Sequence, residues 1–281
     1  MCLIAFAYHV HPACPLVLIA NRDEFLARPT APLAPWDDDP DILGGRDLEA
    51  GGGWLALDRR RSRLAAVTNV REVTPPPPAK SRGALVREFL SGDELAVSFA
   101  ELRRVDGNDY GPFNLLLWDG DDLIVATNRL KPRWEAVQAG VHGLSNGSFD
   151  QPWPKTRRLC GALAEWLDSA AGRAARPDDA VDLDPLYAAL ADEHRPADAE
   201  LPVTGVGIER ERLLSTAFIK LPGYGTRASQ IVMIGRDGRT LFAERRFGEN
   251  GSLLGEQRQL FERPQGPDSS GHHGWPEKTS G

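Results

Sequence analysis

The hydrophobic positions at the start of the chain form two short apolar runs that a polar, proline-containing segment separates. Residues 1–6 and 16–20 are the runs, and His9-Val10-His11-Pro12 lies between them. Two strand-like runs joined by such a turn predict a β-hairpin. The second run ends on Asn21-Arg22-Asp23-Glu24. The hairpin would therefore carry the thiol of Cys2 on one strand and this polar quartet at the end of the other.

Further along, strand and helix patterns occur in groups. Apolar or alternating runs predict strands at 54–57, 64–70, 113–118, 123–127, 134–144, 215–221, 229–234 and 240–247. Apolar residues at helical spacing predict helices from Ser81 to Gly92, from an N-cap at Asp93 through Leu102, from Pro154 to Ala171, and over 184–192. Segment 26–40 is rich in proline and aspartate, which predicts a loop.

Because helix pairs are inserted between groups of strands, the element order predicts an α+β protein in which helices cover antiparallel sheets packed face to face. A doubly wound parallel sheet is not expected, since strands and helices do not alternate one by one. We expect a single domain over residues 1–263. Residues 264–281 are dominated by Gly, Pro, Ser and His, which predicts a disordered tail.

Composition narrows the functional classes. The net charge of −7 argues against a nucleic-acid-binding protein, whose domain would usually be basic. The three cysteines, Cys2, Cys14 and Cys160, have no metal-type spacing, so we expect no metal site, and they suit a reducing compartment. The apolar N-terminus lacks a basic leader, and no stretch is long enough to span a membrane. The sequence thus predicts a cytoplasmic protein without a membrane span.

Cys2 offers two interpretations. Removal of Met1 would leave a free α-amino group beside the thiol, and an N-terminal nucleophile can use its own amine as the base. Arg22 would favour the thiolate, and the carboxylate of Asp23 or Glu24 would orient the amine. The alternative is an inert buried thiol on a strand that ends in a salt-bridged turn.

Two further polar clusters end or begin predicted strands. Asn146 follows the run that ends at Leu144, and an asparagine N–H at a strand end is a donor that suits an oxyanion hole. Asn69 is a similar candidate at the end of an earlier strand. Tyr224 and Arg227 precede the strand at 229–234, although a glycine turn with an exposed arginine would give the same pattern.

Together these clusters resemble the NRDE family, also called the transport and Golgi organisation protein 2 family. The resemblance rests on ten short motifs in order between residue 1 and about residue 235: Met1-Cys2, Asn21 to Glu24, Gly44 to Asp47, Gly53 to Leu55, Thr68 to Arg71, Ser81 to Gly83, Tyr110 to Leu115, Gly143 to Asn146, Pro152 to Lys155 and Tyr224 to Arg227.

The resemblance implies a four-layer αββα sandwich similar to that of N-terminal-nucleophile (Ntn) hydrolases. A more distant similarity is to bile salt hydrolases and penicillin V acylases. Cys2, Asn146 and Arg227 stand at positions that match functional residues of those enzymes. Those enzymes separate an Arg and an Asp by two residues after the second strand, whereas Arg22 and Asp23 are adjacent here. Aligned by that spacing, Asn21 and Glu24 take the two positions.

The resemblance implies two functional hypotheses. In the first, a cysteine Ntn-type hydrolase cleaves amide C–N or thioester bonds of a small acyl substrate, without a required cofactor. Its catalytic residues are Cys2, Arg22, Asp23, Asn146 and Arg227, and its substrate-binding residues are Asn21, Glu24, Asn69 and Tyr224. In the second, the same cleft belongs to a non-enzymatic protein that binds and traffics haem, or binds acyl-coenzyme A or lipid. No haem-attachment motif is present, because Cys14 and Cys160 are isolated.

Overall fold

The computed structural model describes residues 2–73, 78–129 and 133–262. Met1 and residues 264–281 lie outside these ranges, so the expected removal of Met1 and the expected disordered tail stay predictions. No helix in the described ranges combines the length and apolar character that crossing a bilayer needs.

The described residues form two antiparallel sheets of seven strands each. The first sheet, which we call sheet A, has the order β10-β1-β2-β12-β13-β14, with β11 paired to β12. Sheet B follows the chain from β3 to β9. The strands of sheet A are β1 (Cys2–Tyr8), β2 (Leu16–Phe25), β10 (Gly140–Leu144), β11 (Lys220–Leu221), β12 (Tyr224–Ile234), β13 (Arg239–Phe247) and β14 (Leu253–Glu262). Those of sheet B are β3 (Thr30–Trp36), β4 (Asp39–Asp47), β5 (Gly53–Asp58), β6 (Arg63–Asn69), β7 (Phe113–Trp118), β8 (Leu123–Thr127) and β9 (Arg133–Ala136).

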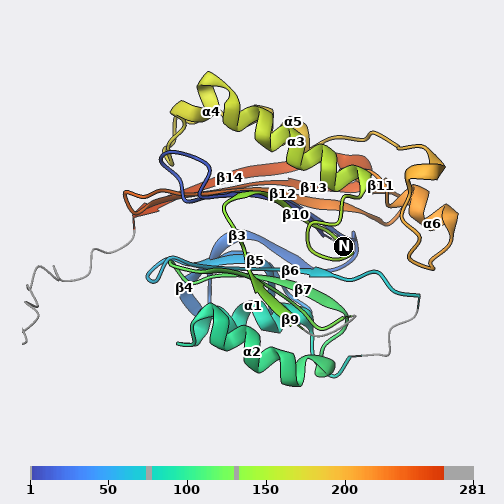
Figure 1. Ribbon diagram of the computed structural model, residues 1–281, viewed down its shortest axis with the longest axis horizontal. Helices are drawn as coiled ribbons and strands as arrows, with labels where there is room; N and C mark the ends of the chain where they lie inside the picture. The colour runs from blue at the N-terminus through green and yellow to red at the C-terminus, as the bar shows by residue number, and fades with distance from the viewer. Residues whose placement is uncertain (1, 74–77, 130–132, 263–281) are drawn as a thin grey trace, which may run out of the picture.

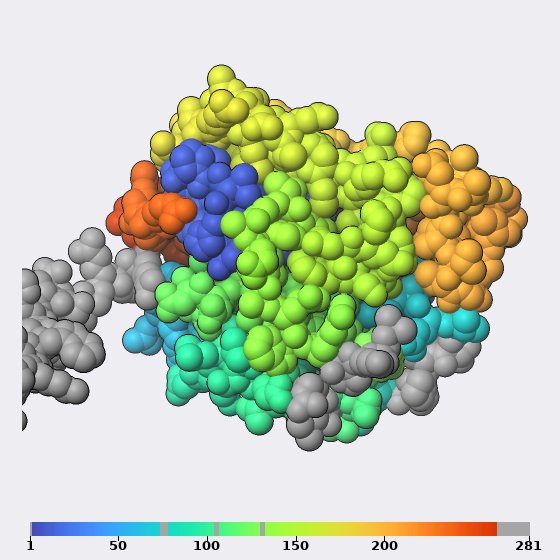
Figure 2. Space-filling view, in the orientation of Figure 1, coloured from blue at the N-terminus to red at the C-terminus, as the bar shows by residue number. Residues whose placement is uncertain are grey.

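Helices cover the outer face of each sheet. α3 (Pro154–Asp168), α4 (Ala170–Ala174) and α5 (Asp184–Leu190) lie over sheet A, while α1 (Arg82–Ser91) and α2 (Ala96–Asp106) lie under sheet B (Figure 1). α6 (Ile208–Leu213) lies at one end of the sandwich (Figure 1). In the space-filling view, the light-green chain that contains β9 and β10 runs from the lower layer to the upper one (Figure 2). The predicted α+β fold with four layers is confirmed.

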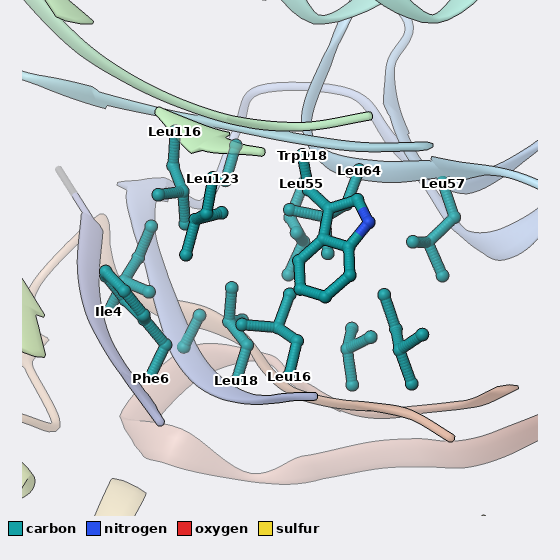
Figure 3. Close-up of a cluster of buried hydrophobic side chains, with 14 of the residues drawn as sticks. Ile4, Phe6, Leu16, Leu18, Leu55, Leu57, Leu64, Leu116, Trp118 and Leu123 are labelled. Atoms are coloured by element: carbon teal, nitrogen blue, oxygen red, sulfur yellow. The ribbon is translucent and has the colours of Figure 1, made fainter. Parts of the chain in front are cut away.

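Strand alternation decides which side chains fill the space between the sheets. The even-numbered residues Ile4, Phe6, Leu16 and Leu18 point toward sheet B, where they meet leucines such as Leu116 (Figure 3). The odd-numbered neighbours, including Leu3, Ala5, Val17 and Ile19, pack under the helices on the other face. Each of the larger of these side chains, those of Val, Leu, Ile and Phe, contributes roughly 1.5–3 kcal/mol when it is fully buried.

The opening hairpin is confirmed. β1 and β2 pair from Cys2 opposite Arg22 to Tyr8 opposite Leu16. The backbone N–H of His9 donates to the carbonyl of Pro15 and closes the turn. His11 is buried in that turn, where its Nδ1 accepts from the N–H groups of Ala13 and Cys14. This explains His11 as a structural residue.

The expected loop at 26–40 is wrong, since β3 and the start of β4 occupy much of it. β3 is the edge strand of sheet B, and an edge tolerates Pro32 and Pro35 because an N–H on the open side needs no partner. Leu33 and Trp36 of this strand are buried. The proline-rich and aspartate-rich composition of the segment therefore predicted a loop where an edge strand forms.

A single strand over 134–144 is also wrong. β9 pairs with β8 in sheet B, whereas β10 pairs with β1 in sheet A. The polar residue Gln138 lies where the chain crosses between the sheets, after β9 and before β10. Of the strand expected at 215–221, β11 alone forms. β14 was not expected, because its half-exposed edge position leaves no strong apolar pattern.

Two helix boundaries also differ from the prediction. α2 begins at Ala96 rather than after an N-cap at Asp93, because the carboxylate of Asp119 from the β7–β8 turn accepts from the N–H of Ala96 at 2.8 Å. The helix expected from Pro154 to Ala171 breaks at Ser169, whose hydroxyl caps α4 by accepting from the N–H of Gly172. The cap of α2 comes from Asp119, which is distant in sequence, so the local pattern around Asp93 could not predict it.

Candidate functional site

Strand alternation also decides which face of sheet A each residue of Asn21-Arg22-Asp23-Glu24, at the end of β2, occupies. The even-numbered residues of β1 and β2 face sheet B, so Cys2, Arg22 and Glu24 share the side between the sheets. The odd-numbered residues Asn21 and Asp23 start from the face that the helices cover. Adjacent residues of the quartet thus have different surroundings.

The thiol of Cys2 lines a cavity of about 530 Å³ between the ends of the two sheets. Arg22, Asp23, Glu24 and Asn69 also line this space, which we call the Cys2 cavity. Its remaining described walls are Phe25, Arg28, Asp47, Gly53, Trp54, Val67 and residues 78–83. Burial raises the pKa of the Cys2 thiol above its ordinary value of 9.0. At neutral pH the sulfur therefore keeps its proton unless a base removes it.

Arg22 is held firmly in the cavity wall. Its guanidinium carbon lies 4.2 Å from the centroid of the Trp54 ring, a cation–π contact, and its side chain donates to the hydroxyl of Thr30 at 3.3 Å. The carboxylate of Glu24 is 3.8 Å from Arg22 Nη2. A fixed positive charge beside Cys2 favours a negative charge on the sulfur.

Asp23 reaches the cavity from the helix-covered face. Its Oδ1 accepts from the hydroxyl of Thr226 at 2.7 Å. Burial raises the pKa of Asp23, and the nearby ammonium of Lys155 acts in the opposite direction. Lys155 itself is buried at the start of α3 and donates to the carbonyl of Leu214 at 3.1 Å. Burial lowers the pKa of Lys155 to about 8, and the carboxylate of Asp23 opposes this shift.

The amide of Asn21 is used by the scaffold. Its Nδ2 donates to the carbonyls of Leu190 and Ala217 at 2.8 Å each, and its Oδ1 accepts from the hydroxyl of Ser229 at 2.6 Å. Tyr224 donates to the backbone carbonyl of Asp23 at 3.3 Å. Neither Asn21 nor Tyr224 is among the described residues that line the Cys2 cavity.

Asn69 and Asn146 bridge the two sheets. Asn146 follows β10 in sheet A, and its Nδ2 donates to the backbone carbonyl and to Oδ1 of Asn69 at 3.0 and 3.1 Å. Within the described ranges, Asn69 Nδ2 has no hydrogen-bond partner, and Asn69 is the one that lines the Cys2 cavity. The amide of Asn146 therefore orients the side chain of Asn69, which lines the same cavity as the thiol.

Asn146 lines a second, larger cavity of about 940 Å³ on the other side of this bridge. Trp153, Phe149 and Val125 give it an apolar part, and Arg71 and Arg129 give it charge. Arg71 forms a buried ion pair with Glu211 of α6, and Arg129 lies 2.6 Å from Glu72. We call this space the large cavity.

Arg227 does not reach the Cys2 cavity. It is the extra residue of a β-bulge in β12, between Thr226 and Ala228. Its Nη1 donates to the backbone carbonyls of Phe25, Leu26 and Arg28 at 2.9, 3.0 and 3.1 Å. Arg227 thereby holds the chain that leaves β2.

Several residues in or near these cavities had no role in the sequence hypotheses. They are Trp54, Arg71, Arg82, Lys155 and Glu211. A signal for two of them was present: Arg82 and Lys155 are cations at the start of predicted helices, where the helix dipole disfavours positive charge. Such a cation suggests a role other than helix stability. Glu211 has no comparable local signal.

Comparison with known proteins adds the family context. Residues 1–249 match the sequence profile of a family described as Transport and Golgi organisation 2. The Transport and Golgi organization protein 2 homolog of Homo sapiens is 33% identical over an alignment of 264 residues, which covers 87% of this chain and 92% of the human protein. The Bos taurus protein of the same name is 32% identical over 276 residues, covering 93% of this chain and 96% of its own length.

Proposed function

The chain belongs to the Transport and Golgi organisation 2 family, as its motifs predicted, and on this premise we propose that the Cys2 cavity is the active site of a cysteine hydrolase acting on amide C–N or thioester bonds. One observation carries the proposal: the thiol of Cys2, the charge of Arg22 and the amide of Asn69 line one cavity, although they come from three strands of two sheets. A thiol, a fixed cation and an N–H donor are the groups that acyl transfer needs.

In this proposal, removal of Met1 frees the α-amine of Cys2 to act as the base. The amine takes the thiol proton, and the sulfur attacks the carbonyl carbon of the substrate. Asn69 Nδ2, oriented by Asn146, donates to the oxyanion that forms. The C–N or C–S bond then breaks, and the α-ammonium gives its proton to the leaving amine or thiol. Water attacks the acyl-enzyme thioester, which releases the acid and restores the thiol.

The other groups tune this step. Arg22 favours the thiolate. Asp23 orients the α-amine, and the hydroxyl of Thr226 holds this carboxylate in place by donating to its Oδ1. Glu24 lies close enough to Arg22 to moderate its charge. We assign Asn21, Tyr224 and Arg227 to the support of β2, because their polar atoms hold the ends of β2 and the chain after it. The proposed compartment is the cytoplasm, which three free cysteines suit.

The test combines processing with labelling. Intact mass of active protein should show that Met1 is absent, and an acylating probe, the p-nitrophenyl ester of a short acid, should add one acyl group at Cys2. Cys2→Ala should lower the rate of nitrophenol release by about 10³-fold or more. Cys160→Ala removes the other half-buried thiol and is the control, with an unchanged rate. Active protein that retains Met1 would rule out this mechanism.

The volume and apolar lining of the large cavity favour a second proposal, a non-enzymatic carrier for haem or for acyl-coenzyme A or lipid. Among the described residues that line it, none is a His, Cys, Met or Tyr, so it offers no axial ligand to haem iron. The thiol that could ligate iron is Cys2, in the other cavity. Haem titration should therefore give a Soret shift that survives Cys2→Ala and is lost in Trp153→Ala if the large cavity is the carrier site. Absence of saturable binding removes the carrier proposal.

A further inference from the structure

Arg82 occupies a distinctive place in the wall of the Cys2 cavity. It is the first residue of α1, and with Ser81 and Gly83 it forms the part of the wall that belongs to the helix layer under sheet B. The start of α1 lies directly against the chain that leads into β5, since a Cβ on Gly52 would be 2.3 Å from the carbonyl carbon of Gly83. This close approach, which glycine permits, holds Arg82 at the cavity.

The other cations of this wall have carboxylate partners. Arg28 lies 2.8 Å from Asp47, Lys80 lies 3.6 Å from Asp109, and Arg22 lies 3.8 Å from Glu24. Arg82 has no carboxylate within ion-pair distance anywhere in the ranges that the structure describes. Its Nη1 donates to the carbonyl of Pro112 at 3.3 Å, and most of its five donors have no partner among the described residues.

Two positive groups lie near Arg82. The backbone N–H groups at the start of α1 add the positive end of the helix dipole, and the first turn of α1 contains no acidic residue. Burial lowers the pKa of Arg82, and the nearby charge of Arg28 acts in the same direction, whereas negative charge at Cys2 or Glu24 opposes the shift. A partly buried guanidinium without a counter-ion is costly, and an anion would remove that cost.

We infer that Arg82, together with the start of α1, binds an anionic group of the substrate, a carboxylate or a phosphate, beside the thiol of Cys2. The guanidinium fork suits either oxyanion, because both accept two parallel N–H bonds. In naming a substrate, this inference rests on the proposed function. It specifies the substrate class as acyl compounds that carry a negative charge close to the bond that is cleaved.

The test compares two thiol reagents of similar size and different charge, and it requires no hydrolysis. Iodoacetate is an anion and iodoacetamide is neutral. Both alkylate the thiolate of Cys2 with loss of iodide. The rate at Cys2 is measured by peptide mass spectrometry on the full chain, and the ratio of the iodoacetate rate to the iodoacetamide rate is the readout. Arg82→Gln should lower this ratio about tenfold, the factor that one charge-assisted hydrogen bond supplies.

Arg28→Gln is the matched control, because it removes the same charge from the same wall but takes it from a paired arginine. It should leave the ratio within about twofold of the wild type. Arg82→Lys keeps the charge without the fork and should retain part of the preference. Protection of Cys2 from iodoacetate by inorganic phosphate or by succinate distinguishes a phosphate site from a carboxylate site.

A second measurement covers the case in which Cys2 resists both reagents. Inorganic phosphate, against sodium chloride at equal ionic strength, should raise the Tm of the wild type and of Arg28→Gln but not of Arg82→Gln. Equal reagent ratios or equal phosphate shifts in the wild type and Arg82→Gln overturn the inference. A preserved anion effect without acylation of Cys2 would instead refute the hydrolase and leave the anion site standing.

Discussion

At the scale of single residues, burial shifts the pKa values of titratable groups at the site away from their ordinary values. Cys2 keeps its proton because burial raises the pKa of its thiol. The ammonium of Lys155 loses its proton at a lower pH than an exposed lysine does, because burial lowers its pKa to about 8. Lys155 is 4% exposed, so solvent screens it little. The negative charge of Asp23 opposes the shift in the pKa of Lys155.

Lys155 predicts a pH dependence of stability. The folded state loses this proton near pH 8, whereas the unfolded chain holds it to the ordinary lysine value of 10.5. Between these values the unfolded state binds more protons, so the contribution of Lys155 to the free energy of unfolding rises with pH. We expect the wild type to gain about 2 kcal/mol relative to Lys155→Met between pH 8 and pH 10.

Urea denaturation of both proteins at the two pH values measures this difference. Lys220→Met, which removes an exposed lysine, is the control and should show no such trend. A difference between wild type and Lys155→Met that stays constant over this range would mean that Lys155 titrates near its ordinary value in the folded protein.

At the scale of elements, strand ends and helix starts place the functional groups. Cys2 begins β1, Arg22 and Asp23 lie near the end of β2, Asn69 ends β6, and Arg82 begins α1. Backbone N–H and C=O groups at such ends have fewer hydrogen-bond partners within the element, so side chains and bulges supply the missing hydrogen bonds. The bulge at Arg227 does this for the chain that leaves β2, by donating to three backbone carbonyls.

Arg227→Met should therefore lower the free energy of unfolding by about 1–3 kcal/mol, because carbonyls that now accept from a charged donor would lose it. Amide exchange of Leu26 and Arg28 should become faster, since the N–H groups of this turn depend on the same chain path. Denaturant unfolding and hydrogen exchange measure the two effects.

Arg236→Met is the control for this variant, since Arg236 donates to one exposed backbone carbonyl, that of Pro12. If Arg227→Met abolished alkylation of Cys2 without any loss of stability, Arg227 would belong to the chemistry rather than to the support of β2.

At the scale of the whole molecule, the two cavities lie where segments distant in sequence meet. Asn69 and Asn146 join the sheets, and Arg71, just after β6, joins sheet B to α6 through its buried ion pair with Glu211. The second oxygen of Glu211 accepts from the N–H and the hydroxyl of Thr204, so the carboxylate is well satisfied. This link fixes the segment that closes one end of the large cavity.

Removing one partner of this ion pair should cost more than removing both. Glu211→Gln should lower the free energy of unfolding by about 3–5 kcal/mol, because the guanidinium of Arg71 would stay buried after losing the negative charge of Glu211. The double variant Arg71→Met/Glu211→Met should be less destabilised than the single one. A double-mutant cycle in urea tests this, with the exposed pair Arg157 and Glu200 as control. Additive effects of the two substitutions would contradict a coupled pair.

The sequence by itself determined the local architecture and part of the site. The apolar runs and the turn at Pro12 specified the β1–β2 hairpin, the Asp119 to Asp122 turn specified β7 and β8, and Ser81 specified the start of α1. These features depend on neighbours in the chain, and periodicity and capping are local properties. The period of two along β2 also determined that Arg22 and Asp23 face opposite sides of the sheet, whereas the register of β2 against β1 placed Arg22 beside Cys2.

Only the tertiary structure decided which of these polar residues meet. Asn69 and Asn146 are 77 positions apart, and their contact depends on the packing of sheet B against sheet A. The surroundings of Lys155 and Arg82 likewise come from burial and from partners on other elements, which no local pattern contains. The chain crosses between the sheets after β2 and again at residues 137–139, which places β6 and β10 in different sheets that then pack together. Side-chain charge is a property of the sequence, whereas its neighbours and its exposure to water are properties of the fold.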